Sequence, residues 1–241
     1  MEVAAVDPGL ELEVIFFHDV LCAWCYAVTP RLERLAGDLA QEGVAVRIEH
    51  RSFALAPEAA DLERMFGSQQ AAKREILNHW RAANANDDEH RIRADLMAER
   101  AFPYPYSTPG LLACQAAAIL EGNEGHRRYF ARVQRAHLTE CLDINDREVL
   151  LACAEEAGFD RGAFTRAMES DEARRRLEVD LALARDWGIT GVPSMVLDRR
   201  WLVVGAHPYD RLKAAFQQVL AERNGGQAVA AADPEAGGER R

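Results

Sequence analysis

Strand-like patterns lie near the two ends of this sequence, and a long helical region separates them. Residues 12–17 and 44–50 form apolar or alternating runs typical of strands, and residues 194–197 and 201–204 form a second pair. Between residues 57 and 186 the apolar side chains recur with the period of a helix. A sheet must therefore be assembled from distant segments, which predicts an α/β fold with a large all-helical insertion.

The first end reads β-α-β and the second reads β-β-α. We therefore predict a discontinuous α/β domain, a helical insertion and a disordered tail. Their predicted ranges are 11–56 with 187–222 for the domain, 57–186 for the insertion and 223–241 for the tail, which is rich in Gly, Ala and charge.

Two local details of the insertion are also predicted. Asn145 is expected to cap a helix that begins at Arg147, with Glu148 at the capping-box position. The charged run Asn86-Asp87-Asp88-Glu89 is expected to be a solvated loop or cap, since it lacks the glycine and the ligand spacing of a calcium loop.

The first apolar run leads directly into Cys22-Ala23-Trp24-Cys25. A nucleophilic cysteine must be a thiolate near neutral pH, whereas an ordinary cysteine has a pKa of about 8.5. At the start of a helix, Cys22 would have its anion stabilised by backbone amides and the helix dipole. Cys22 is therefore the expected nucleophile, and Cys25, one turn later, the expected resolving thiol.

Two other interpretations of this motif remain open. It could be half of a zinc site, but a zinc site needs a second pair of ligands. It could also be two incidental thiols. The remaining cysteines, Cys114, Cys141 and Cys153, are widely spaced, and their roles are open. No metal site is predicted, and disulfide exchange is favoured.

A second short motif, Gly188-Ile189-Thr190-Gly191-Val192-Pro193-Ser194, precedes the third strand. If the Val192–Pro193 bond is cis, the residue before the proline can offer its backbone to an extended substrate chain. An ordinary turn before a strand is the alternative. Val192 and Pro193 are therefore candidate substrate-positioning residues.

Composition excludes several classes of function. The net charge of −10 argues against a general nucleic-acid binder. No apolar run approaches the ~18 residues of a membrane helix, and Met1–Pro8 lacks the basic start of a secretory signal. A cytoplasmic protein without nucleic-acid or membrane partners is expected, as a monomer or a homodimer.

Together these motifs resemble the thioredoxin superfamily, and within it the DsbA-like oxidoreductases of the FrnE-like branch. The residues that carry the resemblance are Asp19–Tyr26, Arg51–Pro57, Asp143–Asp146, Gly188–Ser194, Gly205–Pro208 and Pro30, which stands five residues after Cys25. The resemblance covers roughly residues 11–222. It implies a thioredoxin-like fold in which a cis Pro193 faces Cys22. The hydroxychromene-carboxylate isomerases and kappa-class glutathione transferases are related, but they carry serine at the position of Cys22 and use glutathione.

Two positions depart from the family pattern. Thioredoxins carry a buried acid where this chain has Phe16, so Asp19 is the nearer candidate for tuning the thiols. Strongly oxidising DsbA enzymes carry histidine where this chain has Trp24. Trp24 is expected either to form apolar substrate surface or to pack in the core. His18 is expected to be a surface histidine at the end of a strand, with tuning of Cys22 as the alternative.

The resulting hypothesis is a DsbA-like dithiol–disulfide oxidoreductase acting on protein or low-molecular-weight disulfides and thiols. No tightly bound cofactor is expected, and glutathione is a candidate redox partner. One alternative is a glutathione-dependent isomerase or transferase acting on a small aromatic or polyketide-like molecule. The other is a non-catalytic partner-binding protein in which the two cysteines form a redox or zinc clasp.

Overall fold

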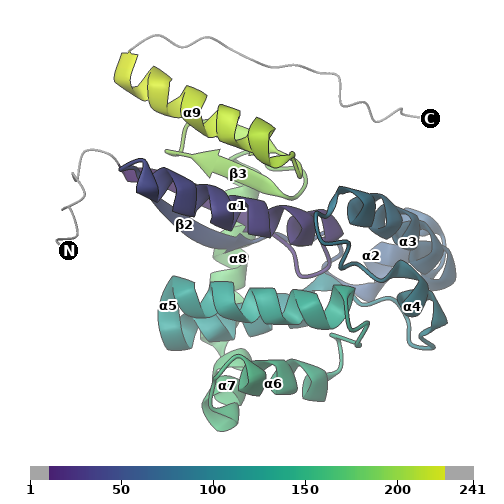
Figure 1. Ribbon diagram of the computed structural model, residues 1–241. Helices are drawn as coiled ribbons and strands as arrows, with labels where there is room; N and C mark the ends of the chain where they lie inside the picture. Colours follow the sequence, from purple (N-terminus) through teal and green to yellow (C-terminus); the bar gives the residue numbers. More distant parts are fainter. Residues whose placement is uncertain (1–10, 226–241) are drawn as a thin grey trace.

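The computed structural model describes residues 11–225 and contains one four-stranded sheet with helices around it (Figure 1). Strand order is β2-β1-β3-β4, with β1 parallel to β2 and antiparallel to β3. β3 and β4 pair as an antiparallel hairpin. The strands span Glu11–His18 (β1), Ala45–Ser52 (β2), Ser194–Leu197 (β3) and Trp201–Val204 (β4).

Helices joined by loops and turns form the rest of the described chain. They span Ala23–Gln41 (α1), Ala59–Phe66 (α2), Gln69–Asn86 (α3), Ala94–Glu99 (α4), Ser107–Leu138 (α5), Arg147–Glu156 (α6), Arg161–Met168 (α7), Asp171–Asp186 (α8) and Tyr209–Gly225 (α9). α5 is broken by non-helical backbone at Glu121 and Gly122, so it consists of two helical segments that meet end to end. The α/β class with a helical insertion is therefore confirmed.

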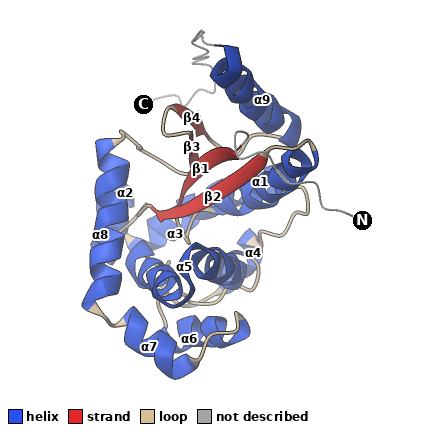
Figure 2. Cartoon of the chain, turned by 90° about the vertical axis from the view of Figure 1, so that its left-hand side faces the viewer, coloured by secondary structure: helices blue, strands red, loops and turns tan. Residues whose placement is uncertain are grey.

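The two faces of the sheet are covered by different helices (Figure 2). α1 and α9 lie on one side, where the apolar residues of α1 pack on Leu12, Val14 and Phe16 of β1. α8 lies on the other side, where Ile15 and Phe17 pack with Ala184 and Trp187. Alternate residues of β1 thus enter two different cores, which explains why its sequence is almost continuously apolar.

Two local predictions require correction, the second of them only in part. Asp146, not Asn145, caps α6 by accepting a hydrogen bond from the Glu148 amide. Asn145 instead bonds the backbone of Tyr106. The charged run Asn86–Glu89 forms a cap, as one of its two predicted alternatives has it, because Asp87 is the C-cap residue of α3. The run is not solvated throughout, since Asp87 is buried and paired with Arg91 at 2.6 Å.

The predicted tail also begins too early. α9 continues to Gly225, so residues 223–225 of the predicted tail belong to this helix. The remainder of the predicted tail, from residue 226, lies outside the described residues. Within residues 11–225, no helix is long and apolar enough to cross a bilayer.

Candidate active site

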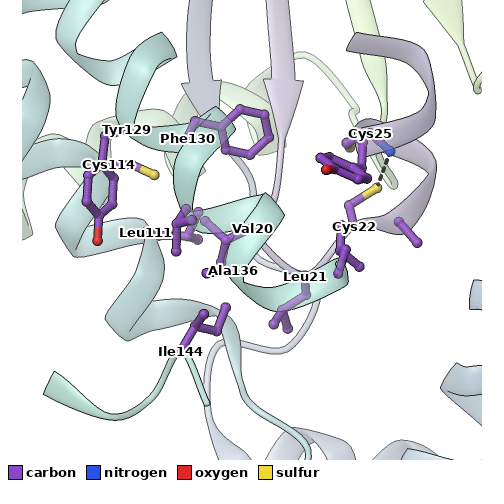
Figure 3. Packing of buried hydrophobic residues seen from close by; sticks show 14 of the residues in the cluster. Val20, Leu21, Cys22, Cys25, Leu111, Cys114, Tyr129, Phe130, Ala136 and Ile144 are labelled. Carbon is purple, nitrogen blue, oxygen red and sulfur yellow. Dashed lines mark hydrogen bonds between the residues drawn. The ribbon is translucent and has the colours of Figure 1, made fainter. Parts of the chain in front are cut away.

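Cys22 stands at the junction between the first strand and α1, as its spacing predicted. It is the N-cap residue of α1, and its Sγ accepts a hydrogen bond from the Cys25 amide at 3.1 Å, drawn as a dashed line in Figure 3. A sulfur at this position faces the unpaired amides of a helix N-terminus, which stabilise negative charge. Both cysteines are reduced here, with Cys22 only 4% exposed and Cys25 fully buried.

The two thiols therefore have different surroundings. Burial raises the pKa of Cys25 well above its usual value, and the neighbouring Cys22 sulfur raises it further. Cys25 consequently stays protonated while Cys22 receives a hydrogen bond from its amide. This asymmetry suits a pair in which Cys22 reacts first and Cys25 second.

The distant proline motif comes to the same place. The Val192–Pro193 peptide bond is cis. The Cys22 thiol donates to the Val192 carbonyl over 3.5 Å, although the two residues are 170 positions apart. Pro193 is buried, and its carbonyl accepts from Gly205 at the end of the β-hairpin. The fold thus brings Val192 and Pro193 against the predicted nucleophile.

Asp19 lies completely buried in the turn that leads to Cys22. Its carboxylate accepts hydrogen bonds from the amides of Leu21 and Leu55 and from the Ser107 hydroxyl, at distances of 2.7–3.0 Å. Burial is the main cause that raises its pKa to about 6, while these hydrogen bonds oppose the rise. Asp19 therefore joins three chain segments and can change protonation near neutral pH.

His18 is not the predicted surface residue. It is fully buried, and its ring packs at 3.6 Å between centroids against Phe130 and at 5.1–5.2 Å against His126 and His50. Burial, followed by the two neighbouring histidines, lowers the pKa of His18 well below its usual value. Among residues 11–225, neither ring nitrogen has a hydrogen-bond partner. The alternation of β1 explains this burial, because His18 points to the same side as Phe16.

An apolar pocket of about 250 Å³ opens beside Cys22. It is lined by Leu21, Cys22, Ala23, Trp24, Leu55, Ala56, Leu62, Met65, Phe66, Ile76, His79, Trp80, Tyr104 and Val192. Trp24 is partly exposed and belongs to this lining while also packing on the core, so both of its predicted roles apply to one side chain. The pocket wall formed by α2 and α3 could not be predicted, because no motif marks those helices.

The three remaining cysteines are not among the residues that line this pocket. His207 is not among the residues lining the pocket, and its carbonyl accepts a hydrogen bond from buried Arg31. Cys114, Cys141 and Cys153 are each buried. Among the described residues, no cluster of three or more His, Cys, Asp or Glu side chains is arranged to hold a metal ion.

The DSBA-like thioredoxin domain matches residues 13–217. The chain belongs to this family. Membership agrees with the order of sheet and helices and with the resemblance that the cysteine and proline motifs indicated.

The chain is 26% identical over 189 residues to the ClpXP adapter protein SpxH of Bacillus licheniformis, in a match that covers 78% of this chain and 58% of that protein. The chain thus spans less than two thirds of the length of this relative.

Two solved structures are also similar to this chain. The probable DsbA oxidoreductase of Streptomyces coelicolor has a TM-score of 0.70 and 26% identity, with coverage of 94% of this chain and 96% of that one. The cytosolic disulfide reductase DsbM of Pseudomonas aeruginosa, solved with GSH, has a TM-score of 0.61 and 25% identity, with coverage of 86% and 98%.

Proposed function

We propose that the chain is a dithiol–disulfide oxidoreductase that acts on disulfides carrying an apolar group beside the sulfur. The observation that carries this proposal is the position of Cys22. It caps a helix, accepts a hydrogen bond from the Cys25 amide, and lines an apolar pocket. The similarity to a DsbA oxidoreductase and to a cytosolic disulfide reductase supports the same chemistry in the cytoplasm.

The reaction proceeds in two exchanges. The Cys22 thiolate attacks one sulfur of a substrate disulfide, so that a mixed disulfide forms and the other substrate sulfur leaves as a thiolate that takes up a proton. Cys25 then loses its proton and attacks the Cys22 sulfur, which releases the second substrate thiol and forms the Cys22–Cys25 disulfide. The reverse sequence oxidises a substrate dithiol and leaves the pair reduced. Glutathione can return the oxidised pair to two thiols, and glutathione disulfide can return the reduced pair to the disulfide.

The second exchange needs a group that accepts the proton of Cys25. We assign this role to Asp19, whose charge is close enough to raise the pKa of Cys25 and whose own pKa is about 6. Asp19 must be ionised to accept a proton. The rate of the second exchange should therefore rise as the pH rises through about 6.

Asp19→Asn tests this assignment. Because general-base catalysis contributes at least about a hundredfold in many enzymes, we expect the variant to slow release of the second thiol by at least about tenfold and to lose the inflection near pH 6. Rapid-quench measurement after formation of the mixed disulfide gives this rate. Ser107→Ala is the control, since it removes one hydrogen bond to the carboxylate but leaves the acid in place. If Asp19→Asn keeps the inflection, another group accepts the proton.

The pocket supports protein disulfides over glutathione disulfide as substrates. Glutathione carries two carboxylates, and no lysine or arginine is among the residues that line the pocket. Met65 at 54% exposure and Leu55 at 41% instead add apolar surface to the lining. Burying an apolar side chain there contributes about 1.5–3 kcal/mol, enough for a tenfold preference or more.

Met65→Lys tests the pocket. We expect kcat/KM for a peptide disulfide with phenylalanine beside the cysteine to fall by about tenfold, since a charge replaces apolar contact surface. Exchange with the small polar reagent hydroxyethyl disulfide should be unchanged. Val179→Lys on α8 is the matched control, because Val179 is similarly exposed, at 59%, and is not part of this pocket. Equal losses of kcat/KM for both variants would show that the pocket does not determine the preference for apolar substrates.

A second candidate function rests on the relatives named as ClpXP adapters. In that function the same apolar surface would bind a partner protein, and the cysteines would serve as a redox clasp. If the wild-type protein binds a partner protein but does not turn over disulfide substrates, this second function is favoured over the first proposal.

A further inference from the structure

One helix of the insertion, α5, holds the turn between β1 and α1 at three points. At its start, Ser107 donates to the Asp19 carboxylate. Three residues later, Gly110 lies so close to Val20 that an added Cβ would be 2.7 Å from the Val20 Cγ2 atom. A side chain at this position would force Val20 to shift, so the turn packs directly on the helix.

The third contact is a single buried amide. The Nε2 atom of Gln134 lies 3.2 Å from the Asp19 carbonyl and 3.1 Å from the Cys22 carbonyl, and donates to both. These are the first and last carbonyls of the turn. Gln134 is 1% exposed and belongs to the second half of α5, which also provides Phe130 and Ala136 to the packing in Figure 3.

Each of the two carbonyls also has a backbone donor. The Cys22 amide donates to the Asp19 carbonyl, and the Tyr26 amide donates to the Cys22 carbonyl. Without the Gln134 amide, each carbonyl would still accept one hydrogen bond. The side chain of Gln134 therefore contributes little to the stability of the fold. What the side chain adds is a fixed width for the turn and a partial positive charge beside Cys22.

We propose that Gln134 is a positioning residue for the reactive thiol, through which the helical insertion sets the redox properties of the cysteine pair. The hydrogen bond from Cys25 to the Cys22 sulfur requires the turn to hold Cys22 within 3.1 Å of the Cys25 amide. Both the geometry and the amide dipole of Gln134 favour the Cys22 thiolate. Since a stabilised thiolate favours the reduced pair, Gln134 makes the couple more oxidising.

The redox consequence of this role depends on the proposed function, but the alkylation test of Cys22 does not. Gln134→Met keeps the volume of the side chain and removes the donor. In glutathione buffers, the Cys22–Cys25 disulfide of this variant should persist to a two- to tenfold higher ratio of [GSH]² to [GSSG], which is about the effect of losing one hydrogen bond. In the reduced protein, alkylation of Cys22 by iodoacetamide, followed by mass spectrometry, should slow by a similar factor at pH 7.

Gln115→Met is the matched control. Gln115 is a second buried glutamine of α5, 3% exposed, and its amide donates to Ser52 and Asp180 instead of the turn. A merely structural role predicts equal effects of the two substitutions on the thiols, and that result would overturn the proposal. Unchanged alkylation and an unchanged glutathione ratio in Gln134→Met would overturn it as well.

A further variant keeps the test decisive if Gln134→Met folds poorly. Gln134→Glu is isosteric and places a carboxylate where the donor was, so it should slow alkylation of Cys22 more than Gln134→Met does. Faster or unchanged alkylation of Cys22 would contradict the proposal. If alkylation responds as expected but no Cys22–Cys25 disulfide forms in any buffer, the proposed function fails while the positioning role of Gln134 stands.

Discussion

Replacement of Cys22 by serine is expected to reduce disulfide exchange by at least about a thousandfold, because a serine hydroxyl is not ionised near neutral pH and forms no disulfide. Cys25→Ser should behave differently. Its Cys22 can still attack, so the substrate remains attached as a mixed disulfide that mass spectrometry detects at one equivalent per chain. Turnover with a peptide disulfide, measured by release of thiol, distinguishes the two variants.

Cys114→Ser and Cys153→Ser serve as controls for these substitutions. Both residues are buried, and neither is among the residues that line the pocket at Cys22. Burial raises the pKa of each of these thiols, which makes them poor nucleophiles. Full turnover in Cys22→Ser, or an equal loss in the controls, would contradict the assigned mechanism.

Acidification is expected to destabilise the fold strongly, because four histidines are buried in uncharged form. Burial lowers the pKa values of His50 and His137 to about 3, and those of His18 and His126 well below the usual value. Below pH 6.5 the unfolded chain binds protons that the folded chain does not, so stability falls as the pH falls toward these values. Each histidine that stays neutral contributes a slope of about 1.4 kcal/mol per pH unit.

Buried carboxyl groups act in the opposite direction. The raised pKa of Asp19, about 6, means that the folded state binds its proton first, so this group restores some stability between pH 6 and 4. Asp180 has a raised pKa for the same reason, burial. Because the histidines outnumber these acids, the free energy of unfolding should still fall by at least about 3 kcal/mol between pH 6.5 and pH 4.5.

Urea unfolding at a series of pH values measures this dependence. His50→Leu should make the slope shallower by about 1.4 kcal/mol per pH unit, since one neutral buried histidine is removed. His79→Gln is the control, because His79 is exposed. A flat profile, or equal slopes for the wild-type protein and His50→Leu, would show that the histidines are not neutral in the folded state.

Local sequence signals were sufficient to predict much of the fold. Strong periodicity marked the four strands, and the spacing of Cys22 and Cys25 after an apolar run placed Cys22 at the start of a helix. These features depend on interactions between residues close in the chain. The pairing of Val192 with Cys22 followed only from the family resemblance, since the two residues are 170 positions apart.

Features that depend on tertiary packing were not predictable. The position of His18 at the end of a strand suggested exposure, but α5 covers it with Phe130 and His126. Gln134 has no motif around it, and its role follows only from where α5 crosses the active-site turn. The pocket wall from α2 and α3 has the same origin, because nothing in those helices reveals which face meets the cysteines.

The central claim is that Cys22 and Cys25 form a reversible redox pair, and equilibration with glutathione buffers tests it most directly. The protein is incubated over a range of [GSH]²/[GSSG] ratios, acid-quenched, alkylated and analysed by mass spectrometry of the peptide that contains both cysteines. The account predicts one two-electron transition, with a potential between about −270 and about −120 mV. Two thiols that stay unlinked in every buffer, or that hold one equivalent of zinc, would contradict it.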